Sequence, residues 1–281
     1  MDARLQTRIQ RYGWDLAADD YEPLWGAQLS GVQRGLLAAA ALAPGESVLD
    51  VATGTGQVAG QAALAVGAMG ARGSVLGVDL SARMVEAAAR RGLPQTRFLR
   101  MDAQQLALPD GHFDAVLCSL GLMYLPDPAQ ALREMRRVLR PGGRVVLAVW
   151  GDRARCGWAP LFEIVDAEVS SEVCPLFFGL GRGDALARLC SDTGLQPAGQ
   201  QRLSTTLDYA DGDEACRAAF LGGPVALAWS RFGADVRQRV RARYLDALAP
   251  WRQGAGYSVP AEFVIVTAQV PQRQAGADPS P

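Results

Sequence analysis

The chain has 281 residues, of which 49% are hydrophobic, so it can bury a full core without disulfides or a bound metal. Its formal net charge is −1 and it has no basic block, which argues against nucleic acid or an anionic membrane surface as a partner. Its five cysteines are an odd number and form no C-x-x-C pair, so neither a disulfide framework nor a metal site is expected. This cysteine usage fits the reducing cytoplasm.

The N-terminal region, residues 1–42, is expected to be helical and not to be a targeting segment. Its first dozen residues mix Asp2 and several arginines with polar residues, unlike a signal peptide. The longest apolar run there, residues 35–43, is far shorter than the roughly 20 residues of a membrane span. We therefore expect no membrane span.

The segment from residue 47 to residue 66 predicts a strand, a glycine turn and a helix. Val48, Leu49 and Val51 have the aliphatic, β-branched character of a strand buried in a parallel sheet. Gly54 and Gly56 allow a tight turn and close approach of a ligand. A helix from residue 57 to residue 66 would then direct its free N–H groups at whatever lies over the turn.

Strand and helix patterns continue to alternate up to residue 150, which predicts a parallel sheet with right-handed crossovers. The further expected strands are residues 73–79, 96–101, 115–119 and 144–150. The helices between them are residues 82–89 and 127–139, the second ended by Pro141-Gly142-Gly143. Beyond residue 150 we expect a helix at residues 184–195, strands at 203–209 and 262–270, and a tail of disordered composition from Pro271.

Asp50 indicates which ligand the glycine turn holds. The turn fits G-x-G-x-x-A, a pattern also found in dinucleotide-binding dehydrogenases. A carboxylate four residues before the first glycine would repel a pyrophosphate, but it suits a ligand with an ammonium and a sulfonium group. In Asp50, Gly54 and Gly56 the chain resembles the Class I S-adenosylmethionine-dependent methyltransferases, whose first motif has this form.

The resemblance implies a Rossmann-like α/β fold with a seven-stranded, mostly parallel sheet whose last two strands form an antiparallel pair. It covers residues 45–151 strongly and the rest weakly. On this template residues 43–270 form the methyltransferase domain, and residues 1–42 form an N-terminal helical lid. Insertions at about 152–183 and 211–258 complete the lid, and residues 271–281 form a disordered tail.

The polar residues at the carboxyl ends of the strands are the site candidates, since open α/β sheets bind ligands there. Asp79 can accept hydrogen bonds from a ribose diol. The resemblance implies that Asp102 and Ala103 contact adenine, that Met84 packs on the purine or belongs to the core, and that Cys118 provides a small side chain. The expected cofactor-binding residues are Asp50, Thr53, Gly54, Gly56, Asp79, Leu80, Met84, Asp102, Ala103 and Cys118, with no metal ligand.

No general base is evident. His112 is the only histidine, and it lies in a turn at the opposite end of the sheet. The segment from Trp14 to Glu22 resembles the opening of the ubiquinone/menaquinone-biosynthesis (type 11) methyltransferases, where a tyrosine can approach the cofactor. Tyr21 is therefore a weak catalytic candidate, although it can equally tie the helix to the core. Aromatic residues after residue 157 would make a largely apolar acceptor pocket.

We expect an S-adenosylmethionine-dependent methyltransferase that acts on a small, fairly apolar molecule of quinone-like or secondary metabolism. Direct displacement would give S-adenosylhomocysteine, with proximity and orientation supplying much of the rate. The expected partner is a small-molecule acceptor, and the protein is expected to be a monomer or a homodimer. Three alternatives stay open: a non-methylating, cyclase-like descendant; metalloid methylation, if three cysteines converge; and an NAD(P)-dependent oxidoreductase, disfavoured because the chain has no lysine.

Overall fold

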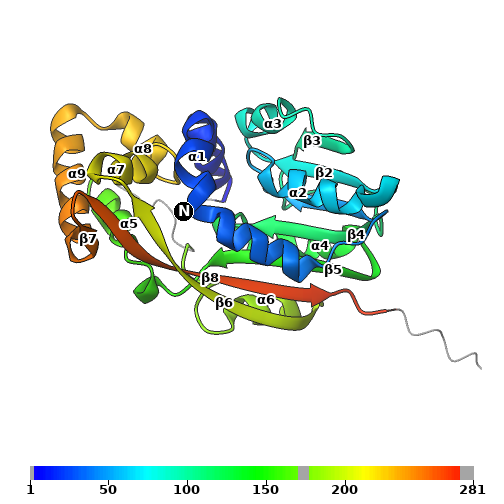
Figure 1. Cartoon of the computed structure of the whole chain (residues 1–281). Helices are drawn as coiled ribbons and strands as arrows, with labels where there is room; N and C mark the ends of the chain where they lie inside the picture. Colours follow the sequence, from blue (N-terminus) through cyan, green and yellow to red (C-terminus); the bar gives the residue numbers. More distant parts are fainter. Residues whose placement is uncertain (1–2, 170–176, 273–281) are drawn as a thin grey trace, which may run out of the picture.

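The computed structural model describes residues 3–169 and 177–272 and has an α/β architecture built on one sheet (Figure 1). The strands follow the order β3-β2-β1-β4-β5-β8-β6, and the short β7 pairs only with β8. Their bounds are β1 Ser47–Val51, β2 Ser74–Asp79, β3 Thr96–Arg100, β4 Phe113–Ser119, β5 Leu139–Trp150, β6 Gln196–Tyr209, β7 Arg252–Gln253 and β8 Gly256–Gln269. The predicted fold class is confirmed, and β7 adds a two-residue strand to the seven expected.

β1 to β5 pair in parallel, whereas β8 runs antiparallel to both β5 and β6. The central strands are apolar because both of their faces are covered. In β5 the residues from Val145 to Val149 are fully buried. The parallel direction brings the carboxyl ends of β1 to β4 to one edge of the sheet, which is where the candidate side chains lie.

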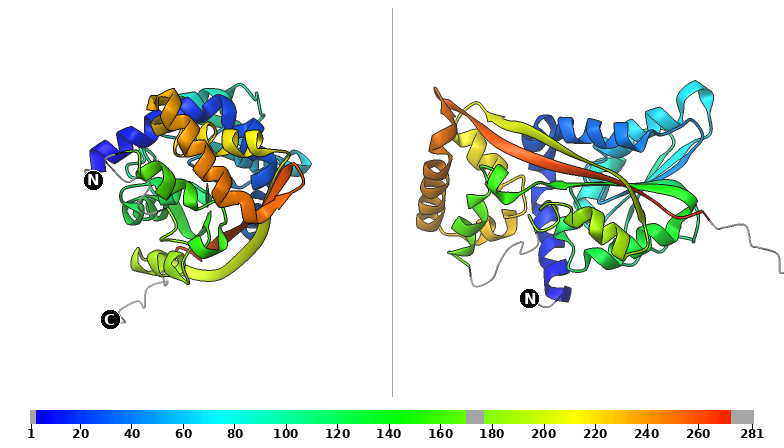
Figure 2. Two further views of the ribbon diagram at one scale, coloured as in Figure 1. Left: turned by 90° about the vertical axis from the view of Figure 1, so that its left-hand side faces the viewer. Right: turned by 90° about the horizontal axis from the view of Figure 1, so that it is seen from below.

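Two layers of helices cover the sheet (Figure 2). On one face lie α2 and the second half of α1, and on the other α4 packs against α6. The bounds are α1 Ala3–Ala40, α2 Gln57–Val66, α3 Ala82–Ala89, α4 Pro128–Val138, α5 Pro160–Asp166, α6 Ala185–Asp192, α7 Gly212–Phe220, α8 Ala226–Arg231 and α9 Ala234–Leu248. Short 3₁₀ turns lie at η1 Ala68–Gly70, η2 Leu122–Tyr124, η3 Arg153–Arg155 and η4 Ala249–Trp251.

Local sequence sets the helix ends. Ser81 begins α3 by accepting a hydrogen bond from the Met84 N–H (3.1 Å). Asp127 does the same for α4 through the Gln130 N–H (2.8 Å), with Pro128 in the first turn. The prediction that α4 reaches residue 139 is wrong by one residue: Leu139 has extended geometry (φ −76°, ψ 142°) and already belongs to β5.

The helix α1 spans 38 residues and changes direction part-way along its length (Figure 2). Pro23 lies inside it, and a proline removes one backbone hydrogen bond and bends a helix. The second half packs on the sheet, and the first half lies over the strand ends beside α3 and α8. The bend therefore lets one helix serve as both a layer of the core and a cover for the site.

β6 and β8 are each longer than predicted, beginning at Gln196 and Gly256. β5 ends at Trp150, opposite Phe263, so the rest of the β6–β8 pair continues beyond the sheet as a two-stranded ribbon. The ribbon leads to the cap, which we define as α5, α7, α8 and α9 with the first half of α1 (Figure 1). The expected insertion at 152–183 includes residues outside the described ranges. Of the expected tail, residues 271–281, only residues 271 and 272 are described.

Among the described residues, no helix combines the length and apolar character that crossing a membrane requires.

Candidate cofactor and acceptor site

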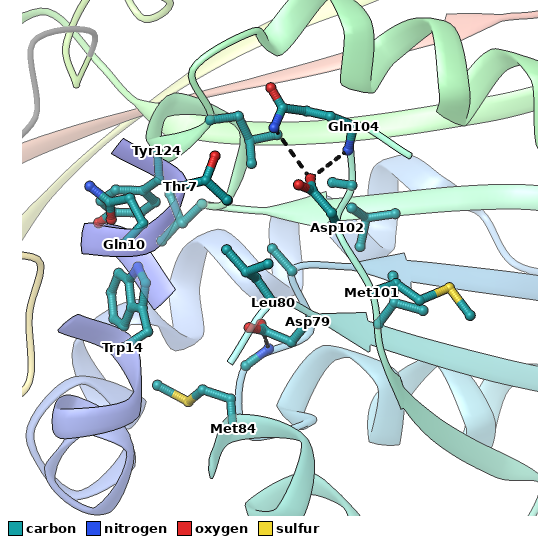
Figure 3. Close-up of a pocket in the computed structure, with 18 of the residues that line it drawn as sticks. Thr7, Gln10, Trp14, Asp79, Leu80, Met84, Met101, Asp102, Gln104 and Tyr124 are labelled. Atoms are coloured by element: carbon teal, nitrogen blue, oxygen red, sulfur yellow. Dashed lines mark hydrogen bonds between the residues drawn. The ribbon is translucent and has the colours of Figure 1, made fainter. Parts of the chain in front are cut away.

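A cleft lies at the carboxyl ends of β1, β2, β3 and β4, beneath the first half of α1. The space between its walls is about 780 Å³, which includes open solvent. Figure 3 shows Thr7, Gln10 and Trp14 of α1 on one side of it. On the other side lie Asp79, at the end of β2, and Leu80 and Asp102, from the loops after β2 and β3. We call this space the cofactor cleft.

Asp79 ends β2 and is held in one orientation by backbone donors. Its Oδ2 accepts a hydrogen bond from the Gly54 N–H (2.9 Å), and its Oδ1 accepts one from the Ser81 N–H (2.9 Å). Burial raises the pKa of Asp79, although these hydrogen bonds oppose the shift. Carboxylate oxygens have further lone pairs, so this side chain can accept two hydroxyl groups from the cleft.

Asp102, after β3, is fixed in a similar way. Its Oδ1 accepts hydrogen bonds from the backbone N–H of Gln104 (2.9 Å) and from the Gln104 side-chain amide (3.3 Å) (Figure 3). Apolar side chains make the adjoining walls of the cleft: Leu80, Met84, Met101 and Ala103. The arrangement suits a flat ring that carries a hydrogen-bond donor at its edge.

Asp50 lies in a smaller polar pocket next to the cleft, where it is 1% exposed. Its Oδ2 accepts a hydrogen bond from Thr53 Oγ1 (2.7 Å). Burial, reinforced by the charge of Asp79, raises the pKa of Asp50 from 3.8 to about 7. Gln33 and Gln57, joined by a 3.0 Å hydrogen bond, also line this pocket. A cation bound here would offset the cost of ionising Asp50.

Two loops beside this pocket hold non-glycine residues in the left-handed region. Ala52, after β1, has φ 56°, and Leu120, after β4, has φ 60°. Such conformations cost about 1–3 kcal/mol each and concentrate at functional sites. The loops also touch closely, because a Cβ added to Gly121 would lie 2.3 Å from the Ala52 Cβ. All three residues line the cleft, so its floor is built from strained, tightly packed backbone.

The structure brings most of the predicted residues together. Six of them line the cofactor cleft with Tyr21: Gly54, Asp79, Leu80, Met84, Asp102 and Ala103. Asp50 and Thr53 line the polar pocket. Among the described lining residues of both spaces, Gly56 and Cys118 are missing. Gly56, at φ +80°, instead lets Ala88 and Phe98 pack closely against the turn.

Two other candidates are not suited to proton or group transfer. Burial raises the pKa of the Cys118 thiol to about 12, so it stays protonated. His112 packs against Phe113 where β4 begins, at the opposite end of the strand from the cleft. Among the described residues, no group of three or more histidine, cysteine or acidic side chains could hold a metal.

We expected residues 1–42 to form a lid and Tyr21 to approach the cofactor, but not that Thr7, Gln10 and Trp14 would line the cleft. Thr7, Gln10, Trp14 and Tyr21 all line it. Their spacings of three, four and seven residues place them on one helical face, a pattern the sequence does contain.

Hydrogen bonds and ion pairs hold this part of α1 against α3. Ser81 Oγ donates to Asp15 Oδ1 (2.6 Å), and the Arg83 N–H donates to the same oxygen (3.2 Å). Further along α1, Asp19 pairs with Arg83 at 2.7 Å, and Glu22 pairs with Arg91. We call this set the α1–α3 contact; it keeps α1 over the cleft.

A second, aromatic chamber adjoins the cofactor cleft. Trp14, Tyr21, Leu120 and Tyr124 line both spaces. The remaining walls of the chamber are Trp25, Leu29, Trp150, Trp158, Gly222, Gly223 and Pro224, so every described lining residue is uncharged. Burial, followed by the charges of Asp79 and Asp50, raises the pKa of Tyr21 above its ordinary value. This phenol stays protonated, so it does not act as a base at neutral pH.

The strand order, the antiparallel last pair and the acidic residues at the strand ends define a Rossmann-like, class I methyltransferase architecture. A family model described as "Methyltransferase domain" (Methyltransf_11) matches residues 49–147. The ubiquinone/menaquinone biosynthesis C-methyltransferase UbiE of Burkholderia mallei is 31% identical over 224 residues, which are 75% of this chain and 86% of that protein. The chain therefore belongs to the class I S-adenosylmethionine-dependent methyltransferases of the type 11 family, as the sequence predicted.

Other relatives match over shorter segments. UbiE of Caulobacter vibrioides is 38% identical over 154 residues, or 51% of this chain and 61% of that protein. An uncharacterized transposon protein of Streptomyces fradiae is 46% identical over 106 residues, which cover 37% of this chain and 30% of that protein. The chain thus matches less than two thirds of these two relatives.

Solved structures support the fold. A putative methyltransferase from Bacillus halodurans superimposes with a TM-score of 0.62 at 19% identity, covering 86% of this chain and 100% of that one. The [4+2]-cyclase SpnF gives 0.54 at 22% identity, with 86% and 80% coverage.

Proposed function

We propose that this protein transfers the methyl group of S-adenosylmethionine to a small, fairly apolar acceptor of quinone-like or secondary metabolism. One observation carries the proposal: a cleft with carboxylates at the strand ends shares a wall with an uncharged aromatic chamber. Trp14, Tyr21, Leu120 and Tyr124 lie between the two spaces and contribute to both. Two ligands of different chemistry can therefore meet at this boundary.

The residues of the cofactor cleft fit the parts of S-adenosylmethionine. Asp79 would accept the ribose hydroxyls, and Asp102 would accept the adenine amino group, with Met84 and Leu80 against the ring. Asp50, Gln33 and Gln57 would hold the amino-acid end in the polar pocket. The ammonium group of that end would favour the charged form of Asp50, whose pKa burial otherwise raises.

S-adenosylmethionine supplies an electrophilic methyl carbon: the acceptor atom bonds to it, the C–S bond breaks, and sulfur keeps the electron pair to give S-adenosylhomocysteine. The protein's part is to align the acceptor and exclude water, which the aromatic walls suit. Tyr21 is protonated and His112 lies at the far end of β4, so neither removes the acceptor's proton. The acceptor is then nucleophilic itself, releases its proton to solvent, or is activated by another residue of the lid.

Calorimetry with S-adenosylmethionine and with NAD tests the cofactor, and a labelled-methyl assay tests the transfer. Because relatives carry the name ubiquinone/menaquinone biosynthesis C-methyltransferase, hydroquinones without the ring methyl group are the first acceptors to try. We expect S-adenosylmethionine to bind and label to pass to an apolar acceptor. Tighter binding of NAD would refute the proposal. Cofactor binding without transfer to any acceptor that binds the chamber would indicate a non-methylating descendant instead.

A further inference from the structure

One side chain of the aromatic chamber has an unused hydrogen-bond donor. Trp158 is 2% exposed, and its Nε1–H has no hydrogen-bond partner among the described residues. Trp25, in the same chamber, differs, because its Nε1 donates to the Ala218 carbonyl at 3.0 Å. Buried donors nearly always have a partner, since a donor removed from water without one is destabilising. The Trp158 N–H therefore needs an explanation.

The surrounding rings hold the Trp158 indole in place. Ring centroids lie 4.6 Å away for Trp150, 5.4 Å for Phe177 and 5.7 Å for Phe162. The backbone is fixed as well, because the preceding Gly157 donates its N–H to the Pro260 carbonyl (2.8 Å). An indole confined in this way cannot turn to reach another acceptor, so its donor is preorganised for a ligand.

The position of Trp158 indicates that a ligand for this N–H would bind in the aromatic chamber. Trp158 lines the chamber but not the cofactor cleft, whereas Trp14, Tyr21 and Tyr124 line both. A molecule that fills the chamber would thus meet the Trp158 side chain away from the shared boundary. A carboxylate or phosphate is disfavoured, because no described residue of the chamber carries a positive charge.

We propose that the Trp158 N–H is a specificity-determining donor that binds an uncharged oxygen of the acceptor. The substrate class is then a flat, conjugated, neutral molecule with a carbonyl-type oxygen on the edge remote from the methylated atom. This inference rests on the proposed function, since it concerns the acceptor of that same site. Trp158 positions the acceptor and takes no part in bond making.

The test compares three small aromatic probes. Acetophenone has a carbonyl oxygen where α-methylstyrene has a CH₂ group, and trimethylphenylammonium is a cation without an oxygen. Binding is measured on the full chain loaded with S-adenosylhomocysteine, after calorimetry has verified loading. We expect acetophenone to bind about three- to tenfold more tightly than α-methylstyrene. This preference should disappear in Trp158→Phe and persist in Trp229→Phe, which alters a cap ring stacked on Phe220.

A second readout does not depend on a variant's folding. With ¹⁵N-indole labelling of the six tryptophans, the Trp158 N–H resonance should shift downfield with acetophenone and not with α-methylstyrene. Equal affinities in the unmodified protein, an unchanged preference in Trp158→Phe, or an unmoved resonance at saturation would each overturn the inference. Tightest binding of trimethylphenylammonium would overturn it in favour of a cation cage. Failure to bind S-adenosylhomocysteine at all would instead refute the proposed function.

Discussion

The cofactor half, residues 47–151, and the cap build their binding surfaces by different means. In the cofactor half, Asp79 and Asp102 are each oriented by a backbone N–H group two residues further along the chain, and Asp79 also by the N–H of Gly54. In the cap and along α1, the chamber is formed by aromatic rings packed edge to face, such as Trp25 on Trp158. Backbone geometry thus fixes the polar site, whereas side-chain volume fixes the apolar one.

If close backbone packing determines the geometry of the cofactor half, adding one methyl group there should cause the largest loss of stability. In Gly121→Ala the new Cβ would lie 2.3 Å from the Ala52 Cβ, and Ala52 is already in the left-handed region. We expect a loss of about 3 kcal/mol in the free energy of unfolding, measured with urea. The control is Gly199→Ala in β6, where a Cβ meets nothing within 4 Å. Equal stability of the two variants would contradict this view of the floor.

Asp79 tests the polar chemistry of the same half. Asp79→Ala removes a charged acceptor, so affinity for S-adenosylmethionine should fall by about 1–3 kcal/mol in calorimetry. Because Asp79 also accepts two backbone N–H groups, Asp79→Asn should retain part of the binding. Asp192→Ala, an exposed acid at the end of α6, makes the same charge change away from the cleft and should bind normally. Unchanged binding by Asp79→Ala would show that the ribose assignment is wrong.

The cofactor half could be predicted because its determinants are local in sequence. The glycine turn follows β1 directly, α2 has the predicted bounds, and Asp79 ends its strand as expected. The cap depends on distant contacts: Trp25 donates to Ala218, 193 residues away, and Gln28 to Asp208, 180 residues away. Periodicity indicates that a helix forms, but it does not say which helix will face it. A lid and an aromatic pocket could therefore be expected, but the α1 residues that face the cleft and the rings that meet in the chamber could not be derived.

The raised pKa of Asp50 leads us to expect that, as the pH rises, the free energy of unfolding falls while the affinity for S-adenosylmethionine increases. Its pKa is about 7 in the folded protein and 3.8 unfolded, so its contribution to stability is full below pH 3.8 and is lost as the pH rises through 7. Between pH 5 and pH 8 the protein should lose about 2 kcal/mol relative to Asp50→Asn, by urea unfolding. A cationic ligand favours the charged form, so affinity for S-adenosylmethionine should rise over the same interval. Parallel stability profiles for the two proteins would refute this account.

The α1–α3 contact links the two regions, so breaking it should weaken ligand retention more than fold stability. Asp15→Ala removes the acceptor for Ser81 Oγ and the Arg83 N–H. We expect S-adenosylhomocysteine to dissociate about fivefold faster in stopped-flow experiments, which corresponds to about 1 kcal/mol. High salt should have a similar effect by screening the Asp19–Arg83 pair. Asp20→Ala on the same helix serves as the control, and an equal rate in both variants would mean that α1 does not retain the ligand.

The smallest loss of stability is expected from breaking an ion pair just beyond the C-terminal end of α1. There Glu46 accepts hydrogen bonds from both Nη atoms of Arg144 (2.9 and 2.8 Å). Arg144 also donates to the carbonyls of Ala40 and Ala41, so the pair joins the end of α1 to β5. Burial acts to raise the pKa of Glu46, but the hydrogen bonds from Arg144 and the Ala43 N–H outweigh it and lower the pKa.

The stabilisation by this pair is therefore present above pH 4.5 and is lost as the pH falls. Glu46→Gln should cost at most about 1 kcal/mol at pH 7 and less at pH 4, measured by urea unfolding. Glu163→Gln in the cap breaks a single, largely exposed contact with Arg153, so it should change little at either pH. If Glu163→Gln lost more stability than Glu46→Gln, surface charge rather than ring packing would be the source of stability in the cap, contrary to the comparison above.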